Sequence, residues 1–180
     1  MHNYDIARHD EGSMKIADDR IEFIDSKVAD VYDYLPREGG DIALPISING
    51  LYDQYGITLL RVEMRNDVSG AFDRASNTVW INKKDIAQRQ RFTASHEFGH
   101  YILHHDHPQE ILYRNYNTDD ELEAEADYFA AKLLMPGHLV KKYWAITKKV
   151  EDMAFIFNVS YSAMDVRLKN LKLKPWSYAQ

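Results

Sequence analysis

Hydrophobic patterns in the first third of the chain predict two helices. In the first, apolar side chains recur at helical spacing: Ile21, Ile24, Val28, Val31 and Leu35. This helix is expected to end before Pro36, because proline cannot continue a helix. A second, short helix is expected from residue 47 to residue 55, since Ser47 is a favoured N-cap residue and Gly56 can end a helix.

The middle of the chain predicts a small sheet followed by a long helix. Residues 57–64 and 78–82 are rich in β-branched and aromatic side chains and predict two strands, and residues 70–72 predict a short third. The helix is expected to run from Asp85 to about His105, with apolar side chains on more than one face. A small antiparallel sheet packed on this helix, with further helices around it, is an α+β fold.

A further helix is predicted to begin at Thr118 and to end before Pro136. Its apolar residues form one stripe: Leu122, Ala126, Phe129, Ala130 and Leu133. Thr118 is a suitable N-cap residue and Glu121 follows three residues later, which is the spacing of a capping box. Glu121 is therefore expected to have a structural role.

The helix predicted from Asp85 contains the motif His-Glu-Phe-Gly-His at residues 96–100. His96 and His100 are one turn apart on the same face, so both imidazoles can reach one Zn²⁺. Zinc lowers the pKa of its water from about 15.7 to about 7, and Glu97 is placed to accept the proton. We therefore interpret Glu97 as the general base of a zinc-dependent peptidase.

A chance motif on a solvent-exposed helix is the alternative interpretation. The apolar side chains around residues 96–100 favour a buried helix, and burying two histidines and a glutamate is costly unless they are paired or bind a metal. Gly99 is a poor helix former, which suggests that another segment packs closely on the helix backbone. Metal binding is therefore the better interpretation.

A catalytic zinc site needs a third protein ligand and one open position. Glu125 lies beside the apolar stripe of the following helix and is expected to be this ligand. Glu123 shares a helix face with Asp127 and is expected to face solvent. For residues 119–121 we prefer a different role, because acidic residues at a helix start stabilise the helix dipole.

Two separated segments resemble the ImmA/IrrE family of bacterial and phage metallopeptidases. They are Arg-Gln-Arg-Phe-Thr-Ala-Ser-His-Glu-Phe-Gly-His-Tyr-Ile-Leu at residues 89–103 and Glu-Ala-Glu-Ala-Asp-Tyr-Phe-Ala-Ala-Lys-Leu-Leu-Met-Pro at residues 123–136. The resemblance extends from about residue 20 to the C-terminus. Asp127 stands where related sequences often have asparagine, a difference that affects no expected ligand.

The resemblance implies that His96 and His100 bind zinc, that Glu97 is the general base and that Glu125 is the third ligand. Members of the family typically act on transcriptional repressors of the helix-turn-helix type, often those of phages or mobile elements, in response to stress. The resemblance thus implies such a repressor as the protein substrate.

Length and composition agree with a small intracellular enzyme. The 180 residues can form one good core, and the absence of cysteine restricts zinc ligands to nitrogen and oxygen. Neither a membrane-spanning stretch nor a signal peptide is predicted, so a cytoplasmic location is expected. Residues 1–14 are expected to be a disordered leader or a tag remnant, residues 15–137 a zincin-like metallopeptidase domain, and residues 138–180 a helical segment packed on the same body.

Other histidines and several tyrosines are candidates for roles near the metal. His104, His105 and His107 suggest a second metal site, but the expected zinc site already has better ligands, and this interpretation is disfavoured. The oxyanion of a peptidase intermediate needs a donor besides the metal. The candidates for this role are tyrosines and one histidine, among which the sequence does not choose: Tyr101, Tyr113, Tyr128 and His138.

Residues 150–171 resemble a helix-turn-helix, with Asn158 at the turn and Ser160 as the cap of the second helix. Residues 138–180 carry a net charge of +5, whereas the rest of the chain carries −11. A basic segment can bind nucleic acid, but a strongly acidic body repels DNA phosphates. Packing on the catalytic body or docking of a protein partner is therefore preferred to DNA binding.

Two classes of function follow. The first is a zinc-dependent endopeptidase that cleaves a helix-turn-helix repressor, and the second is a non-cleaving, zinc-stabilised regulatory module that binds a repressor or DNA or belongs to a toxin–antitoxin pair. Glu97 favours the first, because a purely structural metal site has no need of a base beside the metal.

Overall fold

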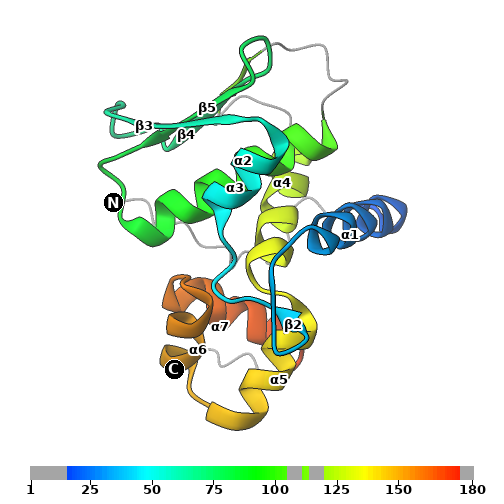
Figure 1. Cartoon of the computed structure of the whole chain (residues 1–180). Helices are drawn as coiled ribbons and strands as arrows, with labels where there is room; N and C mark the ends of the chain where they lie inside the picture. Colours follow the sequence, from blue (N-terminus) through cyan, green and yellow to red (C-terminus); the bar gives the residue numbers. More distant parts are fainter. Residues whose placement is uncertain (1–15, 105–110, 114–119, 175–180) are drawn as a thin grey trace.

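The computed structural model describes residues 16–104, 111–113 and 120–174 (Figure 1). Its elements, in chain order, are α1 (Asp18–Asp33), β1 (Arg37–Glu38), β2 (Asp41–Ile42), α2 (Ile48–Tyr55), β3 (Thr58–Val62), β4 (Gly70–Asp73), β5 (Thr78–Asn82), α3 (Ala87–Leu103), β6 (Ile111–Tyr113), α4 (Asp120–Leu134), α5 (Gly137–Thr147), α6 (Val150–Phe157) and α7 (Tyr161–Asn170). The predicted α+β class is confirmed.

The larger sheet is mixed rather than purely antiparallel. Its strand order is β3-β5-β4-β6, with β4 antiparallel to both neighbours and β3 parallel to β5. The chain crosses over between β3 and β4, so that β3 lies beside the second strand of the β4–β5 hairpin and runs in the same direction. The expected antiparallel sheet was wrong in this respect, because strand patterns do not reveal which strands become neighbours. A separate hairpin joins β1 and β2.

The sheet covers α3, and the helices extend away from it. Figure 1 shows the sheet at one end of the molecule, α2 and α3 next to it, and α4 leading from α3 towards α5, α6 and α7 at the other end. Helix α1 lies beside α4. One hydrophobic core connects these layers, from Ile24 of α1 through Phe98 of α3 to Leu168 of α7.

Several helix ends follow the capping chemistry expected from the sequence. The Ser47 hydroxyl accepts a hydrogen bond from the Gly50 amide, and Gly56 ends α2 in the left-handed conformation with a φ of 65°. Ser160 caps α7 in the same way, and Asn158 adopts a left-handed conformation after α6. Helix α3 begins at Ala87 instead of Asp85. The expected cap at Thr118 lies outside the described residues.

Helices α3 and α4 approach each other closely at Gly99. A Cβ atom added there would lie 3.3 Å from the Cα and carbonyl oxygen of Ala126 and 3.2 Å from Cδ1 of Phe129. Because two of these atoms belong to the backbone, neither helix can relieve the contact by moving a side chain alone. The close packing expected at this glycine is thus present, and it fixes the distance between the two helices.

Replacing Gly99 by leucine is expected to destabilise the protein by about 1–3 kcal/mol, because overpacking forces α3 and α4 apart. Leucine is a better helix former than glycine, so a loss cannot come from helix propensity. Urea denaturation of Gly99→Leu and of the control Ala145→Leu, at an exposed helical position, measures this effect. The control should change stability by less than about 0.5 kcal/mol. Equal effects of the two substitutions would contradict a packing constraint at Gly99.

Candidate metal centre

Helix α3 buries polar side chains in the middle of its length. All eight residues from 93 to 100 are buried, among them His96, Glu97 and His100. The exposed fraction is 0% for His96 and 1% for His100. Such residues are stable in an interior only when they have strong polar partners, and these come from α4.

A three-donor cluster forms where α3 faces α4. Nε2 of His96 lies 3.0 Å from Nε2 of His100, and the carboxylate of Glu123 reaches both nitrogens, at 3.2 Å from His96 and 3.1 Å from His100. Among the described residues, His96, His100 and Glu123 are the group whose ligand atoms converge in this way.

The donor set fits a zinc ion. Two imidazole nitrogens and one carboxylate oxygen are zinc ligands, and ligands about 2.0–2.2 Å from the metal in a tetrahedron lie about 3.3 Å from each other, close to the separations found. The side chain of Glu123 is 23% exposed, so the cluster is open to solvent on that side. A catalytic site needs such access for water and substrate.

The ionisation of these side chains suits a cation. Burial lowers the pKa of His100 to about 4, which keeps the ring neutral at pH 7 with a lone pair for a metal. Burial alone would raise the pKa of Glu123, but its hydrogen bonds with His100 and His96 outweigh this and hold the pKa well below its usual range. Glu123 therefore carries a negative charge, and the His100 ring beside it is neutral.

The ring nitrogens that face away from the cluster also have partners. Nδ1 of His96 lies 2.7 Å from a carboxylate oxygen of Asp127, and Nδ1 of His100 lies 3.0 Å from Nδ1 of His104. A histidine that donates from Nδ1 presents the lone pair of Nε2. The carboxylate of Asp127 favours this tautomer in His96, and the contact with His104 is compatible with it in His100.

The expected third ligand, Glu125, is not in this cluster. Its carboxylate accepts hydrogen bonds from Nε and Nη2 of Arg20 at 2.7 and 2.6 Å and lies 2.9 Å from Nε2 of His104. The structure therefore favours Glu123 over Glu125 as the third ligand. Two helix positions separate these residues, so their side chains project in different directions from α4.

The sequence pattern predicts a solvent-facing Glu123, whereas the structure places its carboxylate against His96 and His100. Glu123 and Asp127 do share a face, but that face packs on the histidine face of α3. A pattern of polar side chains cannot distinguish a face in water from a face on a buried polar partner. The matching spacing was the available signal: two carboxylates four residues apart on α4 face two histidines four residues apart on α3.

Glu97 follows His96 in α3, and its carboxylate lies against Gly70, the first residue of β4. It is 1% exposed, and a Cβ atom at Gly70 would lie 3.0 Å from its Oε1 and 2.5 Å from Cγ2 of Thr93. Strand β4 can approach Glu97 this closely only because residue 70 has no side chain. The glycine thus helps to define the position of the carboxylate.

The candidate oxyanion donors lie in varied surroundings. The Tyr128 hydroxyl donates to Asp25 of α1, the Tyr101 ring packs edge-on against Phe72, and His138 is exposed on α5. The first two contacts favour structural roles. The side chain of Tyr113 lies outside what the structure describes, as do His105 and His107 of the disfavoured second metal site.

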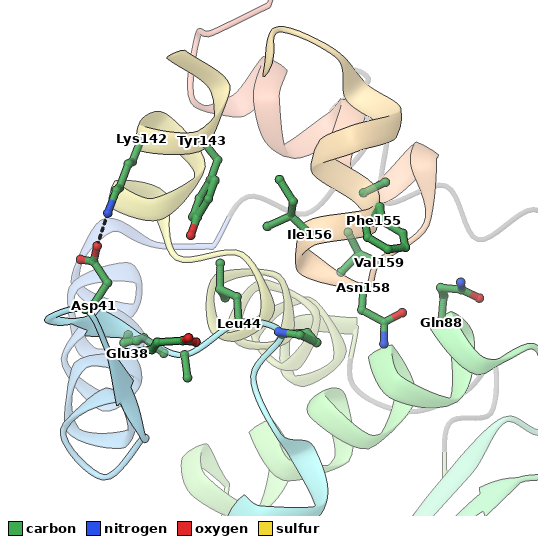
Figure 2. Close-up of a pocket in the computed structure, with 15 residues that line it drawn as sticks. Glu38, Asp41, Leu44, Gln88, Lys142, Tyr143, Phe155, Ile156, Asn158 and Val159 are labelled. Carbon is green, nitrogen blue, oxygen red and sulfur yellow. Dashed lines mark hydrogen bonds and ion pairs between the residues drawn. The ribbon is translucent and has the colours of Figure 1, made fainter. Parts of the chain in front are cut away.

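A separate hollow of about 930 Å³ lies between the β1–β2 hairpin and helices α5 and α6 (Figure 2). Leu44 and Ile156 contribute to its apolar wall, and an ion pair between Asp41 and Lys142 spans one edge. The lining contains no member of the three-donor cluster, so this hollow is distinct from the candidate metal centre.

The C-terminal helix pair uses its basic side chains within the protein. Arg167 of α7 is buried and donates two hydrogen bonds to the carbonyl oxygen of Met135. Lys169 and Lys174 both form ion pairs with Asp165. A helix that reads DNA needs such side chains free to reach the groove, so these contacts favour a structural role for α7.

Comparison with known proteins agrees with this geometry. The IrrE N-terminal-like domain family, peptidase family M78, matches residues 53–169, which include α3, α4 and both parts of the cluster. Metallopeptidase ImmA of Bacillus subtilis is 25% identical over 131 residues, covering 68% of this chain and 77% of that protein. The radiation response metalloprotease IrrE of Deinococcus radiodurans is 29% identical over 120 residues, which are 61% of this chain but 36% of that protein.

A solved structure supports the fold. A Mycobacterium tuberculosis transcriptional regulator superposes with a TM-score of 0.58 at 12% identity, covering 86% of this chain and 47% of that one. No helix in the described part of the chain is both long and apolar enough to cross a membrane.

Since the family match extends over more than half of the sequence, and the relatives are named metallopeptidases, the chain belongs to the ImmA/IrrE family of metallopeptidases.

Proposed function

We propose that the protein is a zinc-dependent endopeptidase whose metal is held by His96, His100 and Glu123, with Glu97 as the general base. The observation that carries this proposal is the convergence of the three donors, two of them on the helix that also buries Glu97. The family resemblance supports a transcriptional repressor of the helix-turn-helix type as the substrate, and such a substrate would be cleaved in the cytoplasm.

The proposed chemistry assigns a separate task to each side chain. Zinc, when bound, makes water more acidic and polarises the carbonyl group of the peptide. Glu97 accepts a proton from the attacking water as the oxygen–carbon bond forms, and it delivers that proton to the leaving nitrogen as the carbon–nitrogen bond breaks. His96 and His100 remain neutral throughout, with Asp127 holding the first ring in place.

Zinc is proposed in preference to other metals on two grounds. Two imidazoles and one carboxylate also suit iron, but the His-Glu-x-x-His motif with its glutamate beside the ligands is the arrangement of zinc peptidases. Hydrolysis requires no change in oxidation state, and zinc is redox-inactive.

A regulatory module that binds a repressor without cleaving it is the second candidate. One relative is an immunity region protein of Bacillus phage phi105, 26% identical over 106 residues, and its name does not include an enzymatic activity. The names of these relatives give no support to a toxin–antitoxin role. Burial of Glu97 beside the cluster favours the peptidase, because a binding module has no use for a base there.

Replacing Glu97 by glutamine tests the peptidase directly. The amide has the same shape but cannot accept the proton, so cleavage is expected to fall by at least about 100-fold, while zinc content and unfolding free energy change little. Zinc analysis combined with a cleavage assay on the repressor encoded nearest to the gene provides the measurement. Full cleavage by Glu97→Gln would contradict the mechanism.

Parallel substitutions of the two glutamates of α4 test the ligand assignment. Glu123→Gln is expected to weaken zinc binding by much more than the about 10- to 100-fold that loss of an outer hydrogen-bond partner costs, whereas Glu125→Gln should remain within that range. Competition with a chelator, on protein verified as folded by circular dichroism, measures both affinities. The reverse order of effects would assign the third ligand to Glu125.

Gly70→Ala tests whether β4 positions Glu97. The added methyl group would clash with Thr93, a stiff β-branched residue, and would press on Glu97. A displacement of about 1 Å at a catalytic group can cost about 100-fold in rate, so kcat should fall while zinc affinity stays within about threefold. The control is Gly137→Ala, where the new methyl meets only ordinary contacts at 3.6 Å or more. Unchanged kcat in Gly70→Ala would refute this role.

A further inference from the structure

A chain of hydrogen bonds leads from His100 to helix α1. Nδ1 of His100 lies 3.0 Å from Nδ1 of His104, and Nε2 of His104 lies 2.9 Å from Oε2 of Glu125. Arg20 of α1 closes the chain with two hydrogen bonds to the two oxygens of Glu125, at 2.6 and 2.7 Å. Arg20, His100 and Glu125 belong to helices α1, α3 and α4. His104 directly follows α3.

Only one arrangement of protons satisfies the contacts from His100 Nδ1 to Arg20 and leaves Nε2 of His100 free for a metal. His100 must then carry its proton on Nδ1 and donate it to Nδ1 of His104. His104 must therefore be protonated on Nε2, from which it donates to Glu125. The carboxylate of Glu125 accepts from both His104 and Arg20, so each link has one donor and one acceptor.

The members of this chain are held in place independently of the metal. The side chains of His104 and Glu125 are 3% and 8% exposed, and Arg74 donates a hydrogen bond from Nη2 to the backbone carbonyl oxygen of His104. The pair of bonds between Arg20 and Glu125 is bidentate, the geometry that fixes a carboxylate most firmly. Rotation of the His104 ring would break its hydrogen bonds with both His100 and Glu125.

We propose that Arg20, Glu125 and His104 act as positioning residues that hold His100 in the tautomer and ring orientation required for metal binding. The inference rests on the proposed function in one respect, the assignment of His100 as a ligand. It makes helix α1, which lies outside the segment that matches the family, a part of the support of the metal centre. It also gives Glu125 an outer role in place of the ligand role expected from the sequence.

The expected effect is a loss of zinc affinity. Outer hydrogen-bond partners of metal-bound histidines typically contribute about 10- to 100-fold in affinity. His104→Phe and Glu125→Gln are therefore each expected to raise the zinc dissociation constant by about 10- to 100-fold. Arg20→Gln should raise it by less, because Arg20 is the last link and its side chain is 38% exposed.

The experiment measures zinc dissociation constants by chelator competition on the full chain. The variants are Arg20→Gln, His104→Phe, Glu125→Gln and the double variant His104→Phe/Glu125→Gln. If the residues act through one chain, the double variant should bind zinc about as weakly as His104→Phe alone. Cobalt(II) replaces zinc in a second measurement, where its visible absorption bands should keep their shape in the variants of the chain but change in Glu123→Gln.

Asp25→Asn is the matched control. Asp25 also links α1 to α4, through an ion pair with Lys132 and a hydrogen bond from Tyr128, and neither partner belongs to the hydrogen-bond chain. Its zinc affinity should equal that of the wild type. An equal loss in Asp25→Asn and Arg20→Gln would overturn the proposal in favour of general loosening of α1.

The outcomes separate this inference from the proposed function. Tight zinc binding by the wild type with unchanged affinity in His104→Phe and Glu125→Gln would overturn the positioning role and leave the peptidase intact. A change in the cobalt spectrum of Glu125→Gln as large as in Glu123→Gln would make Glu125 a ligand and also overturn the proposal. A folded wild-type protein that binds no zinc would overturn the proposed function itself.

Discussion

The packing of α3 directly on α4 is the constraint on which the candidate metal centre depends. Gly99 allows the two backbones to approach until a Cβ atom at that position would lie 3.3 Å from Ala126. At this separation the carboxylate of Glu123, one turn away on α4, reaches the nitrogens of both histidines. The same packing buries both histidines, and burial keeps His100 neutral. The absence of a side chain at Gly99 thus permits the helix packing on which the burial of both histidines and the neutral state of His100 depend.

Around this contact, the protein arranges its polar side chains in layers. His96, His100 and Glu123 form the inner layer, and their outer atoms contact Asp127 and His104. Glu125 and Arg20 continue the second branch to α1. Each inner group therefore has a defined orientation before any metal binds, and a preorganised site loses less conformational entropy on binding. The sheet contributes from the other side, where β4 lies on Glu97 at Gly70.

Much of this architecture could be predicted from the sequence, for physical reasons that differ between elements. The caps at Ser47 and Ser160 are local chemistry and were predicted correctly. The burial of α3 followed from apolar residues on several faces, and the close approach at Gly99 followed from an unfavourable helix residue. The ImmA/IrrE family is confirmed as well. The parallel pairing of β3 with β5 could not be predicted, because it depends on a crossover and not on any strand pattern.

The carboxylate that faces the two histidines was the least predictable feature of the candidate site. Glu123 and Glu125 belong to the same acidic helix segment, and only the direction of each side chain distinguishes them. Glu125 borders the apolar stripe and therefore seemed the inward-facing residue. In the structure that direction leads to His104 and Arg20, while the polar face with Glu123 meets the polar face of α3. The contact between two polar faces is a tertiary property that one helix alone does not reveal.

The measurement that tests the central claim most directly is anomalous diffraction at the zinc absorption edge from crystals of the zinc-loaded protein. The account predicts one strong peak between Nε2 of His96, Nε2 of His100 and the carboxylate of Glu123, with Glu97 adjacent and Glu125 still bound to His104 and Arg20. A peak coordinated by Glu125, or no peak at the histidines in zinc-saturated crystals, would contradict it.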